Sequence, residues 1–256
     1  MIGSIADLRR ASVPGLRSFF AARYSASNAS LVLVGDFQSA DARLLVERTL
    51  GRLPARPVPA RPVPAPVHLR APVVSTVRDH VALERSTLAW HAPPAFSEDH
   101  VDVEVLAALL GQGKGARLVR ALVYEQLLAE SVEVRYEPMA AGGHLVIEAT
   151  AQPDRRASQL EEAIAFELER LRSAPPTAEE VTRACALVES DRLAALGSLE
   201  DLAATLQGLE LFGQDSRRLE EIWIAPLRRV TPATVAKVGA RIFGAPAALI
   251  RTLPRG

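Results

Sequence analysis

A glycine-rich break between two apolar segments is the first candidate for chemistry in this sequence, and it consists of Gly111-Gln112-Gly113-Lys114-Gly115. A phosphate-binding loop would follow a strand and place its lysine directly before Ser or Thr. Here an apolar helix precedes the break, Lys114 is followed by Gly115, and the dinucleotide-binding pattern G-x-G-x-x-G fails at its third glycine. We therefore expect a hinge between two helices, formed by glycines with positive φ, in preference to a phosphate site.

Histidine, a common metal ligand, occurs here without the spacing of a metal site. The five histidines are isolated in the sequence, at His68, His80, His91, His100 and His144. His100 and Glu104 are four residues apart at the start of a predicted helix, where both side chains share one face and could touch a metal. We interpret this pair as a solvated helix end, because no further ligand accompanies it.

The remaining candidates are one thiol and a group of carboxylates. Cys185 is the only cysteine, and we expect a buried small side chain within a helix, since a nucleophilic thiol needs a neighbouring base. No intrachain disulfide can form, so the redox compartment stays open. Glu130, Glu133 and Glu137 could serve an unrelated enzyme, but carboxylates that alternate along a strand are typical of a solvated face.

Composition narrows the class of protein. The chain has 256 residues, of which 48% are apolar, enough for a sizeable core. Its formal net charge is zero, which argues against a nucleic-acid partner, because such a partner requires a basic surface. No apolar run reaches the roughly 18 residues of a membrane span. The first residues lack the pattern of a signal peptide, which leaves the compartment undecided between the bacterial cytoplasm and periplasm.

The N-terminal region predicts a helix, a strand and a second helix. Ser12 caps a helix over residues 13 to 24, residues 30 to 35 form a short apolar run typical of a buried strand, and residues 39 to 50 form the second helix. Such a unit is too small to bury a core. We therefore expect the first 52 residues to dock on something else, for which a neighbouring copy is one possibility.

Residues 54 to 66 contain six prolines and a near-duplicated ARPVP unit. Proline-rich segments of this kind adopt extended, semi-rigid conformations. We interpret the segment as a linker between two ordered regions, with a proline-rich recognition ligand as the alternative.

The second region mixes strands and helices without strict alternation. The expected strands cover residues 68–79, 84–91, 130–137, 144–151 and 247–252, and the expected helices cover 97–110, 116–128, 158–172, a long helix after Thr177, and two or three more within 198–242. This order favours an α+β fold, with a mixed, mainly antiparallel sheet and helices packed on one face.

Two blocks of the sequence resemble one family, the pitrilysin-like or insulinase-type zinc peptidases. Residues 106 to 136 resemble the signature of that family's second domain. Residues 19 to 36 resemble the end of its first domain, where the family pattern is F-x-x-x-Y followed by P-x-N-A-x-L-x-V-V-G-D, although the proline is missing here. The resemblance implies that residues 1–53 are the C-terminal fragment of a first domain, 54–66 a linker, and 67–256 a complete second, non-catalytic domain.

The chemistry of the family requires an inverted zinc motif, H-x-x-E-H, in which two histidines bind zinc and the glutamate acts as general base. The motif belongs to the family's first domain and occurs nowhere in this sequence. The resemblance therefore implies that zinc is held only by a catalytic domain that this chain lacks. We expect the chain alone to be inactive and to contain neither catalytic residues nor a metal site.

The family's second domain often presents an arginine and a tyrosine to the substrate, within a pattern such as L-R-E-K-Q-G-L-A-Y-S-V. The matching stretch begins at Leu122, and it places Val123 at the arginine position and Glu130 at the tyrosine position. Valine donates no hydrogen bond to an oxyanion, and glutamate would repel one. Tyr124 is displaced by one residue, which rotates it by about 100° around a helix.

The favoured hypothesis is a non-catalytic domain of a zinc metallopeptidase that forms the wall of a peptide-binding chamber. Its partners would be a catalytic half, in the same chain or in a partner subunit, and a peptide substrate. The resemblance makes Gly111, Gly113, Lys114 and Gly115 the candidate substrate-binding residues. The alternative is a catalytically inactive scaffold or partner subunit with the same fold, and a homo-dimer is also possible.

Overall fold

The computed structural model describes residues 4–58 and 69–255. His68 and most of the predicted linker, residues 59–66, lie outside the described residues. The chain forms two compact units: residues 1–63 with 197–216, and residues 64–196 with 217–256. The domain boundaries expected from the sequence, at 53 and 67, remain a prediction.

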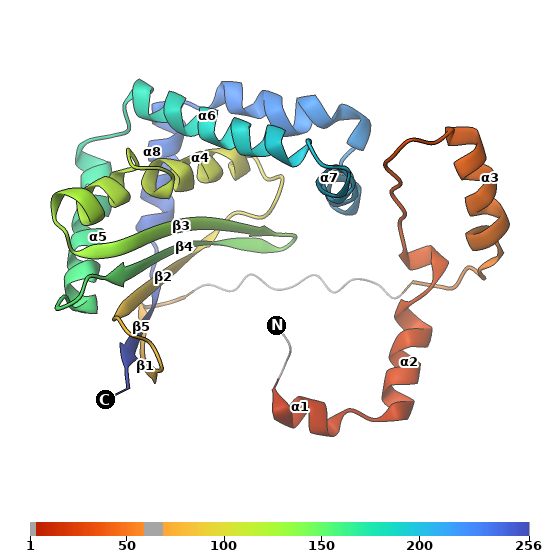
Figure 1. Ribbon diagram of the computed structural model, residues 1–256, viewed down its shortest axis with the longest axis horizontal. Coiled ribbons are helices and arrows are strands. Elements are labelled where there is room, and N and C mark those ends of the chain that lie inside the picture. Colours follow the sequence, from red (N-terminus) through yellow and green to blue (C-terminus); the bar gives the residue numbers. More distant parts are fainter. Residues whose placement is uncertain (1–3, 59–68, 256) are drawn as a thin grey trace. The chain divides into compact units, whose positions relative to one another are not determined.

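A five-stranded sheet in the order β1-β5-β2-β4-β3 forms the frame of the second unit (Figure 1). Its strands are β1 (Val73–Asp79), β2 (Arg85–Ala92), β3 (Ala129–Met139), β4 (Gly142–Ala151) and β5 (Ala248–Pro254). β1 pairs with β5 in parallel, whereas the three other pairings are antiparallel. The expected mixed sheet is therefore confirmed.

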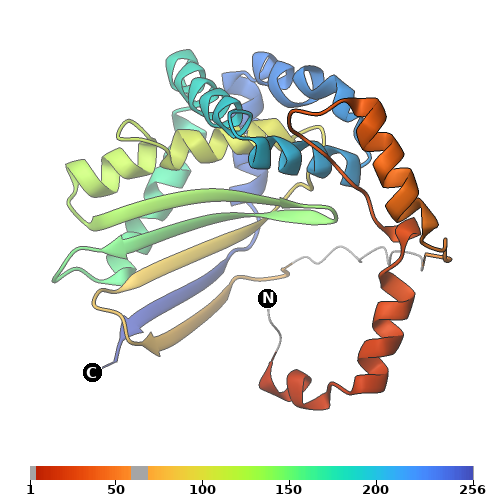
Figure 2. The ribbon, with the colours of Figure 1, turned by 45° about the vertical axis from the view of Figure 1, so that its right-hand side comes forward.

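The helices of this unit cover one face of the sheet and leave the other face open (Figures 1 and 2). They are α4 (His100–Gly111), α5 (Ala157–Ser173), α6 (Ala178–Ala195) and α8 (Pro232–Phe243), joined by shorter helical segments that include η3 (Val119–Glu125) and η5 (Glu220–Ile224). None of the helices in the described part of the chain is long and apolar enough to cross a membrane. The expected arrangement, with helices on one face, is confirmed.

Helix α4 lies at the centre of the core and contacts β3, α6 and α8. Val103, Val105, Leu106, Leu109 and Leu110 on this helix are all 0% exposed. Together with two neighbouring alanines, these residues place apolar side chains on every side of the helix. A helix that is apolar all round is typically buried. The apolar segment before the glycine-rich break is thus the innermost element of the domain.

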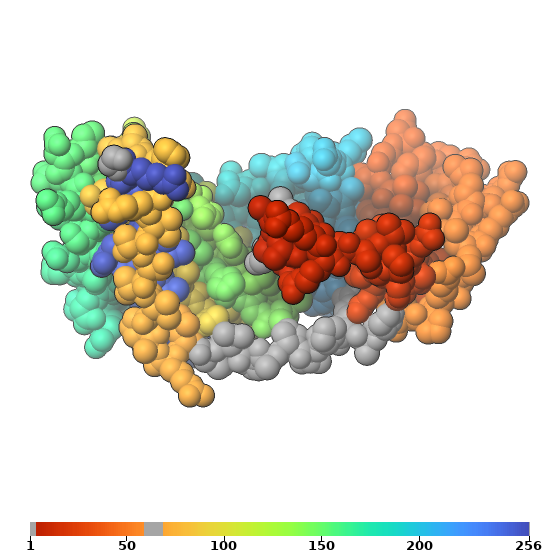
Figure 3. Space-filling view, turned by 90° about the horizontal axis from the view of Figure 1, so that it is seen from below, coloured from red at the N-terminus to blue at the C-terminus, as the bar shows by residue number. Residues whose placement is uncertain are grey.

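The two edges of the sheet differ in burial. β1 is exposed at every position, and its side chains lie at the surface in the view from below (Figure 3, gold). The opposite edge strand, β3, lies against α4. The buried core of the unit is therefore concentrated beneath α4, on the side of the sheet formed by β2, β4 and β3.

The start of α6 confirms the capping box expected after Thr177. The Thr177 N–H donates to Glu180 Oε2 at 2.8 Å, and the Glu180 N–H donates to Thr177 Oγ1 at 3.2 Å. Arg117 also binds Glu180, with both of its nitrogen–oxygen distances at 2.8 Å, and it donates to the carbonyl oxygens of Ala174 and Pro175. The hydrogen bonds from Arg117 are the main reason why the pKa of Glu180 falls to about 2.

The first unit contains α1 (Ile5–Arg10), α2 (Val13–Arg23), α3 (Ser39–Thr49) and α7 (Leu199–Leu211). The two helices expected near the N-terminus are confirmed as α2 and α3, and Ser12 caps α2 by accepting from the Gly15 N–H. None of the residues from 4 to 58 is buried.

The prediction of a strand over residues 30 to 35 is wrong, because the structure has no strand there. Leu31 and Leu33 are 53% and 49% exposed. A strand forms only when a neighbouring strand satisfies its backbone groups. The described residues of this chain place no such neighbour beside the segment.

We predict that Glu180→Gln lowers the free energy of unfolding at pH 7 by about 2 kcal/mol, because Arg117 then loses its charged partner. The pKa of Glu180 is lower in the folded state than its ordinary value of 4.5, so this stabilisation is present above pH 4.5. It should disappear as the pH falls from about 4.5 towards about 2. Denaturant titrations across this pH range measure it.

Glu169→Gln is the matched control, since Glu169 is an exposed carboxylate on α5 that pairs only with the exposed Arg172. It should leave the unfolding midpoint nearly unchanged. A deficit of Glu180→Gln that is the same at pH 7 and pH 2.5 would contradict the assignment.

Candidate functional site

Gly111 is the last residue of α4, and its role is close packing. A Cβ atom at Gly111 would lie 2.6 Å from Val134 Cβ and 2.8 Å from the Val134 backbone nitrogen. No side chain other than hydrogen fits at these distances, so the end of α4 rests directly on β3. Gly111 is also helical and has no positive φ, so the expectation that it belongs to a positive-φ hinge is wrong.

The other two glycines of the break differ from Gly111 and from each other. Gly113 has φ +79°, and nothing lies within 4 Å of the place where its Cβ would be. It is the one member of the break that fits the expected hinge geometry. At Gly115 a Cβ would lie 2.6 Å from Nη1 of Arg183 on α6, so the guanidinium lies against the bare backbone there. Lys114, between them, is exposed.

A hollow of about 330 Å³ adjoins the break, between α4, β3 and α6. Its polar lining includes Glu104, Gln112, Glu133 and Asp191. Each carboxylate already has a partner: Asp191 accepts from Gln112 Nε2 at 2.7 Å, Glu133 pairs with Arg135, and Glu104 pairs with Arg192. The hollow is therefore polar, with two of its carboxylates paired to arginines and the third hydrogen-bonded to an amide, and its lining contains no nucleophile with a neighbouring base.

Arg192 joins α4, α6 and η5 behind this hollow. It is 7% exposed, binds both carboxylate oxygens of Glu104, and donates to the carbonyl oxygen of Trp223. Its guanidinium carbon also lies 5.6 Å from the centre of the Trp223 ring. These partners offset the cost of burying the Arg192 charge.

His100 and Glu104 form part of the same network, and the expectation of a solvated helix end is wrong. The His100 side chain is 15% exposed, and its Nε2 lies 3.9 Å from Glu104 Oε2. The Tyr136 hydroxyl donates to the Pro93 carbonyl oxygen at 2.8 Å, which leaves it to accept from His100 Nδ1 at 3.3 Å. Burial, helped by the charge of Arg192, lowers the pKa of His100 to about 4.

The positions that the family uses for substrate contact carry no such chemistry here. Val123 is half-buried against the core, Glu130 is exposed at the start of β3, and Tyr124 is 51% exposed. Leu127 has φ +51° and is 59% exposed. It occupies the position at which the family pattern has glycine, so the backbone turn persists while the residue suited to it is absent.

The described residues show no cluster of metal ligands. Within residues 4–58 and 69–255, no three His, Cys, Asp or Glu side chains come together as metal ligands. His91 and His144, which no local pattern connects, lie opposite each other on β2 and β4 with ring centres 5.8 Å apart. Burial raises the pKa of the Cys185 thiol, with smaller contributions from Asp102 and Glu189, which keeps the thiol protonated and unreactive.

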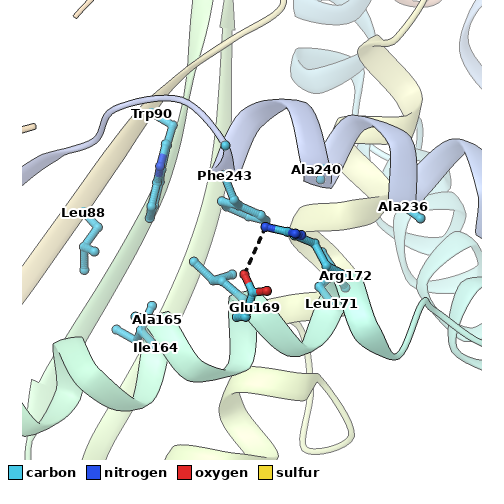
Figure 4. A pocket seen from close by; sticks show the side chains of 13 residues that line it. Leu88, Trp90, Ile164, Ala165, Glu169, Leu171, Arg172, Ala236, Ala240 and Phe243 are labelled. Carbon is cyan, nitrogen blue, oxygen red and sulfur yellow. Dashed lines mark hydrogen bonds and ion pairs between the residues drawn. The ribbon is translucent and has the colours of Figure 1, made fainter. Parts of the chain in front are cut away.

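A second hollow, of about 460 Å³, lies between α5 and α8 above β2 (Figure 4). Trp90 and Phe243 meet edge to face at its wall, with ring centres 5.2 Å apart. Glu169 and Arg172 pair at its rim, at 3.4 Å. The lining is mainly apolar and offers no catalytic group.

We predict that Gly111→Ala lowers the free energy of unfolding by about 2–3 kcal/mol, because the added methyl group must push α4 away from Val134. Gly142→Ala is the matched control, since nothing lies within 4 Å of that Cβ position and φ is not positive. Equal unfolding midpoints for the two variants in urea would show that α4 and β3 are not in close contact.

We predict that His100 makes stability depend on pH. Its pKa is lower in the folded state than its ordinary value of 6.5, so its contribution is complete above about pH 6.5 and is lost as the pH falls towards 4. The loss should reach roughly 3 kcal/mol. His100→Gln should flatten this part of the curve, whereas His80→Gln, at an exposed position, should not. Identical pH curves for the wild type and His100→Gln would refute this.

Comparisons with known proteins agree on one family. The family model described as the peptidase M16 inactive domain matches residues 11–188. Zinc protease PqqE of Helicobacter pylori (strain ATCC 700392 / 26695) is 25% identical over 205 residues, which are 79% of this chain and 46% of that protein. The chain thus spans less than half the length of this curated relative.

Solved structures show the same fold. A protease from Helicobacter pylori superposes with a TM-score of 0.85 at 22% identity, over 99% of this chain and 62% of that one. The peptidase M16 inactive domain from Pseudomonas fluorescens also gives 0.85, at 20% identity, over 99% and 60%. The periplasmic protease PqqL from Escherichia coli gives 0.81 at 17% identity, over 98% of this chain and 29% of that one. The family match covers more than half of the chain, and the chain therefore belongs to the peptidase M16 inactive-domain family.

Proposed function

We propose that this chain forms the wall of a chamber that holds a peptide for cleavage by a separate, zinc-bearing catalytic half. The observation that carries the proposal is the open face of the sheet. An antiparallel sheet with helices on one face alone has its other face against water or against another domain, and the side chains on that face distinguish the two cases.

The part of the open face formed by β2, β4 and β3 is mainly polar, whereas Val73 and Val77 of β1 and Ile250 of β5 expose apolar side chains on it. On β4, Leu145, Ile147 and Ala149 are buried on the helix side, so Glu148 points the other way. Glu148 pairs with Arg85 of β2 at 3.3 Å.

On β3, Arg135 reaches Glu133 at 2.7 Å and Glu137 at 3.4 Å. A face of paired charges suits a water-filled cavity with a polar peptide backbone, because charged residues are depleted at the buried core of an interface between domains.

We propose that the peptide also touches the glycine-rich break, which lies on the helix side of the sheet beside the edge strand β3 and so can be reached around that edge. Gly113 and Lys114 are exposed, and Gly115 is half-buried. Backbone without side chains lets a peptide main chain approach closely. Gly111 belongs to the proposed contact as the residue that fixes the break on β3.

The catalytic half is either an earlier part of the same polypeptide or a partner subunit. Residues 1–53 are proposed as the end of its domain, with 54–66 as linker and 67–256 as the complete non-catalytic domain. In support, residues 4–58 expose large apolar side chains such as Phe19, Phe20 and Leu45, which are 54%, 53% and 62% exposed. Exposed apolar surface of this extent is typical of an interaction site.

A second candidate is an inactive scaffold or partner subunit that never operates with a catalytic half. Val123 and Glu130 favour it, because they stand where the family has an arginine and a tyrosine for the substrate. The two candidates differ in whether this chain stimulates cleavage by a zinc-bearing half.

We predict that the purified chain binds no stoichiometric zinc and cleaves no peptide, and that mixing it with the H-x-x-E-H-bearing half from the same genome raises peptide cleavage at least tenfold over that half alone. Metal analysis and a fluorogenic peptide assay measure this. Phe20→Asp should prevent complex formation in size-exclusion chromatography, whereas Arg17→Asp, on the same helix, should not.

Zinc and cleavage in this chain alone would refute the chamber-wall proposal. A stable complex without stimulated cleavage would instead favour the scaffold.

A further inference from the structure

Arg183 on α6 is half-buried, and two of its three guanidinium nitrogens are buried without partners. Its Nε and Nη2 atoms are inaccessible to solvent, and no hydrogen bond to them exists among the residues that the structure describes. Its Nη1 lies against the backbone of Gly115, in the glycine-rich break. Arg183 therefore faces the break with its donors unused.

This situation is unusual, because buried polar groups in native proteins nearly always have a hydrogen-bond partner. Arg117, two residues after the break, is a contrasting case. All of its guanidinium nitrogens donate hydrogen bonds, to the Glu180 carboxylate and to two carbonyl oxygens. Arg85 also has an unpartnered nitrogen, but its guanidinium pairs with Glu148. An uncompensated buried guanidinium is costly, and an anion is what would relieve it.

The glycine-rich break adds a positive charge and further hydrogen-bond donors. Lys114 is exposed on it, and the break contains no acidic residue. In the described chain, the backbone N–H groups of Gly113, Lys114 and Gly115 donate no hydrogen bond to another backbone group. Lys114, Arg183 and these N–H groups together form a set of donors around a turn without side chains at Gly113 and Gly115.

We propose that this set binds a carboxylate of the peptide held by the chamber, either its C-terminal carboxylate or an acidic side chain. A guanidinium matches a carboxylate through two parallel hydrogen bonds. The positive φ of Gly113 gives the turn a pivot, and a shift of the segment from Gly113 to Gly115 opens Arg183 to the ligand. The proposal rests on the chamber function and names the chemistry that one part of the wall recognises.

The test uses three fluorescein-labelled decapeptides without other acidic residues: one with a free C-terminus, one amidated, and one amidated with a single internal Glu. Fluorescence anisotropy with the full chain should show the amidated peptide binding at least tenfold more weakly than a carboxylate-bearing one. The two carboxylate-bearing peptides distinguish a C-terminal from a side-chain source.

Arg183→Met should remove this preference, and Lys114→Met should reduce it. Arg78→Met, which removes the same charge from β1 at the opposite edge of the sheet, should leave it intact. Arg183→Met should not lower the thermal midpoint of the free protein, because it removes an unpaired buried charge, and this separates ligand binding from a structural role.

A second measurement does not depend on peptide binding. Sodium acetate should raise the thermal midpoint of the wild type above that in sodium chloride of equal ionic strength, and should not do so for Arg183→Met. Equal binding of acid and amidated peptides overturns the carboxylate site but leaves the chamber wall standing. Acetate stabilisation without binding of any peptide supports the site and counts against the chamber function. Failure of both measurements overturns the site.

Discussion

The fold depends on how closely the buried helix α4 approaches β3. The helix is apolar on every side, so it is stable only when sheet and helices enclose it completely. Gly111 makes that enclosure possible, because any larger residue would overlap Val134. The glycine-rich break therefore starts from a fixed point, and the positive φ of Gly113 follows two residues after this close contact.

The arginines inside the domain need hydrogen-bond partners, just as α4 needs to be enclosed. Arg117 and Arg192 each join elements far apart in the sequence, and each uses its donors on a carboxylate and on carbonyl oxygens. Both thereby fix α6 against its neighbours. Arg183 lies on the same helix without any of these bonds, so its position makes sense if a group from outside the domain completes it.

The sequence predicted most of the second unit because its signals are local. The alternation along β3, the capping box at Thr177 and the apolar run before Gly111 each act within a few residues. The strand over residues 30–35 could not be judged in this way, since pairing depends on a neighbour that the described residues do not supply. The pairs Arg192–Glu104 and His91–His144 depend on register across the fold, which no local pattern encodes.

In the stretch from Leu122 to Val132, positions that pack in the core can be compared with positions that the family uses for substrate contact. Two positions where it keeps the family pattern, Leu122 and Ala129, are 0% exposed, whereas two others, Gln126 and Ser131, are exposed. Where it departs from the pattern, at Glu130 and Leu127, the side chains are exposed. Leu127 even retains a left-handed turn that costs about 1 kcal/mol or more for a residue other than glycine. The packing residues Leu122 and Ala129 thus follow the family pattern, while Val123 and Glu130 lack the groups that would act on a substrate, which supports the chamber wall proposed above.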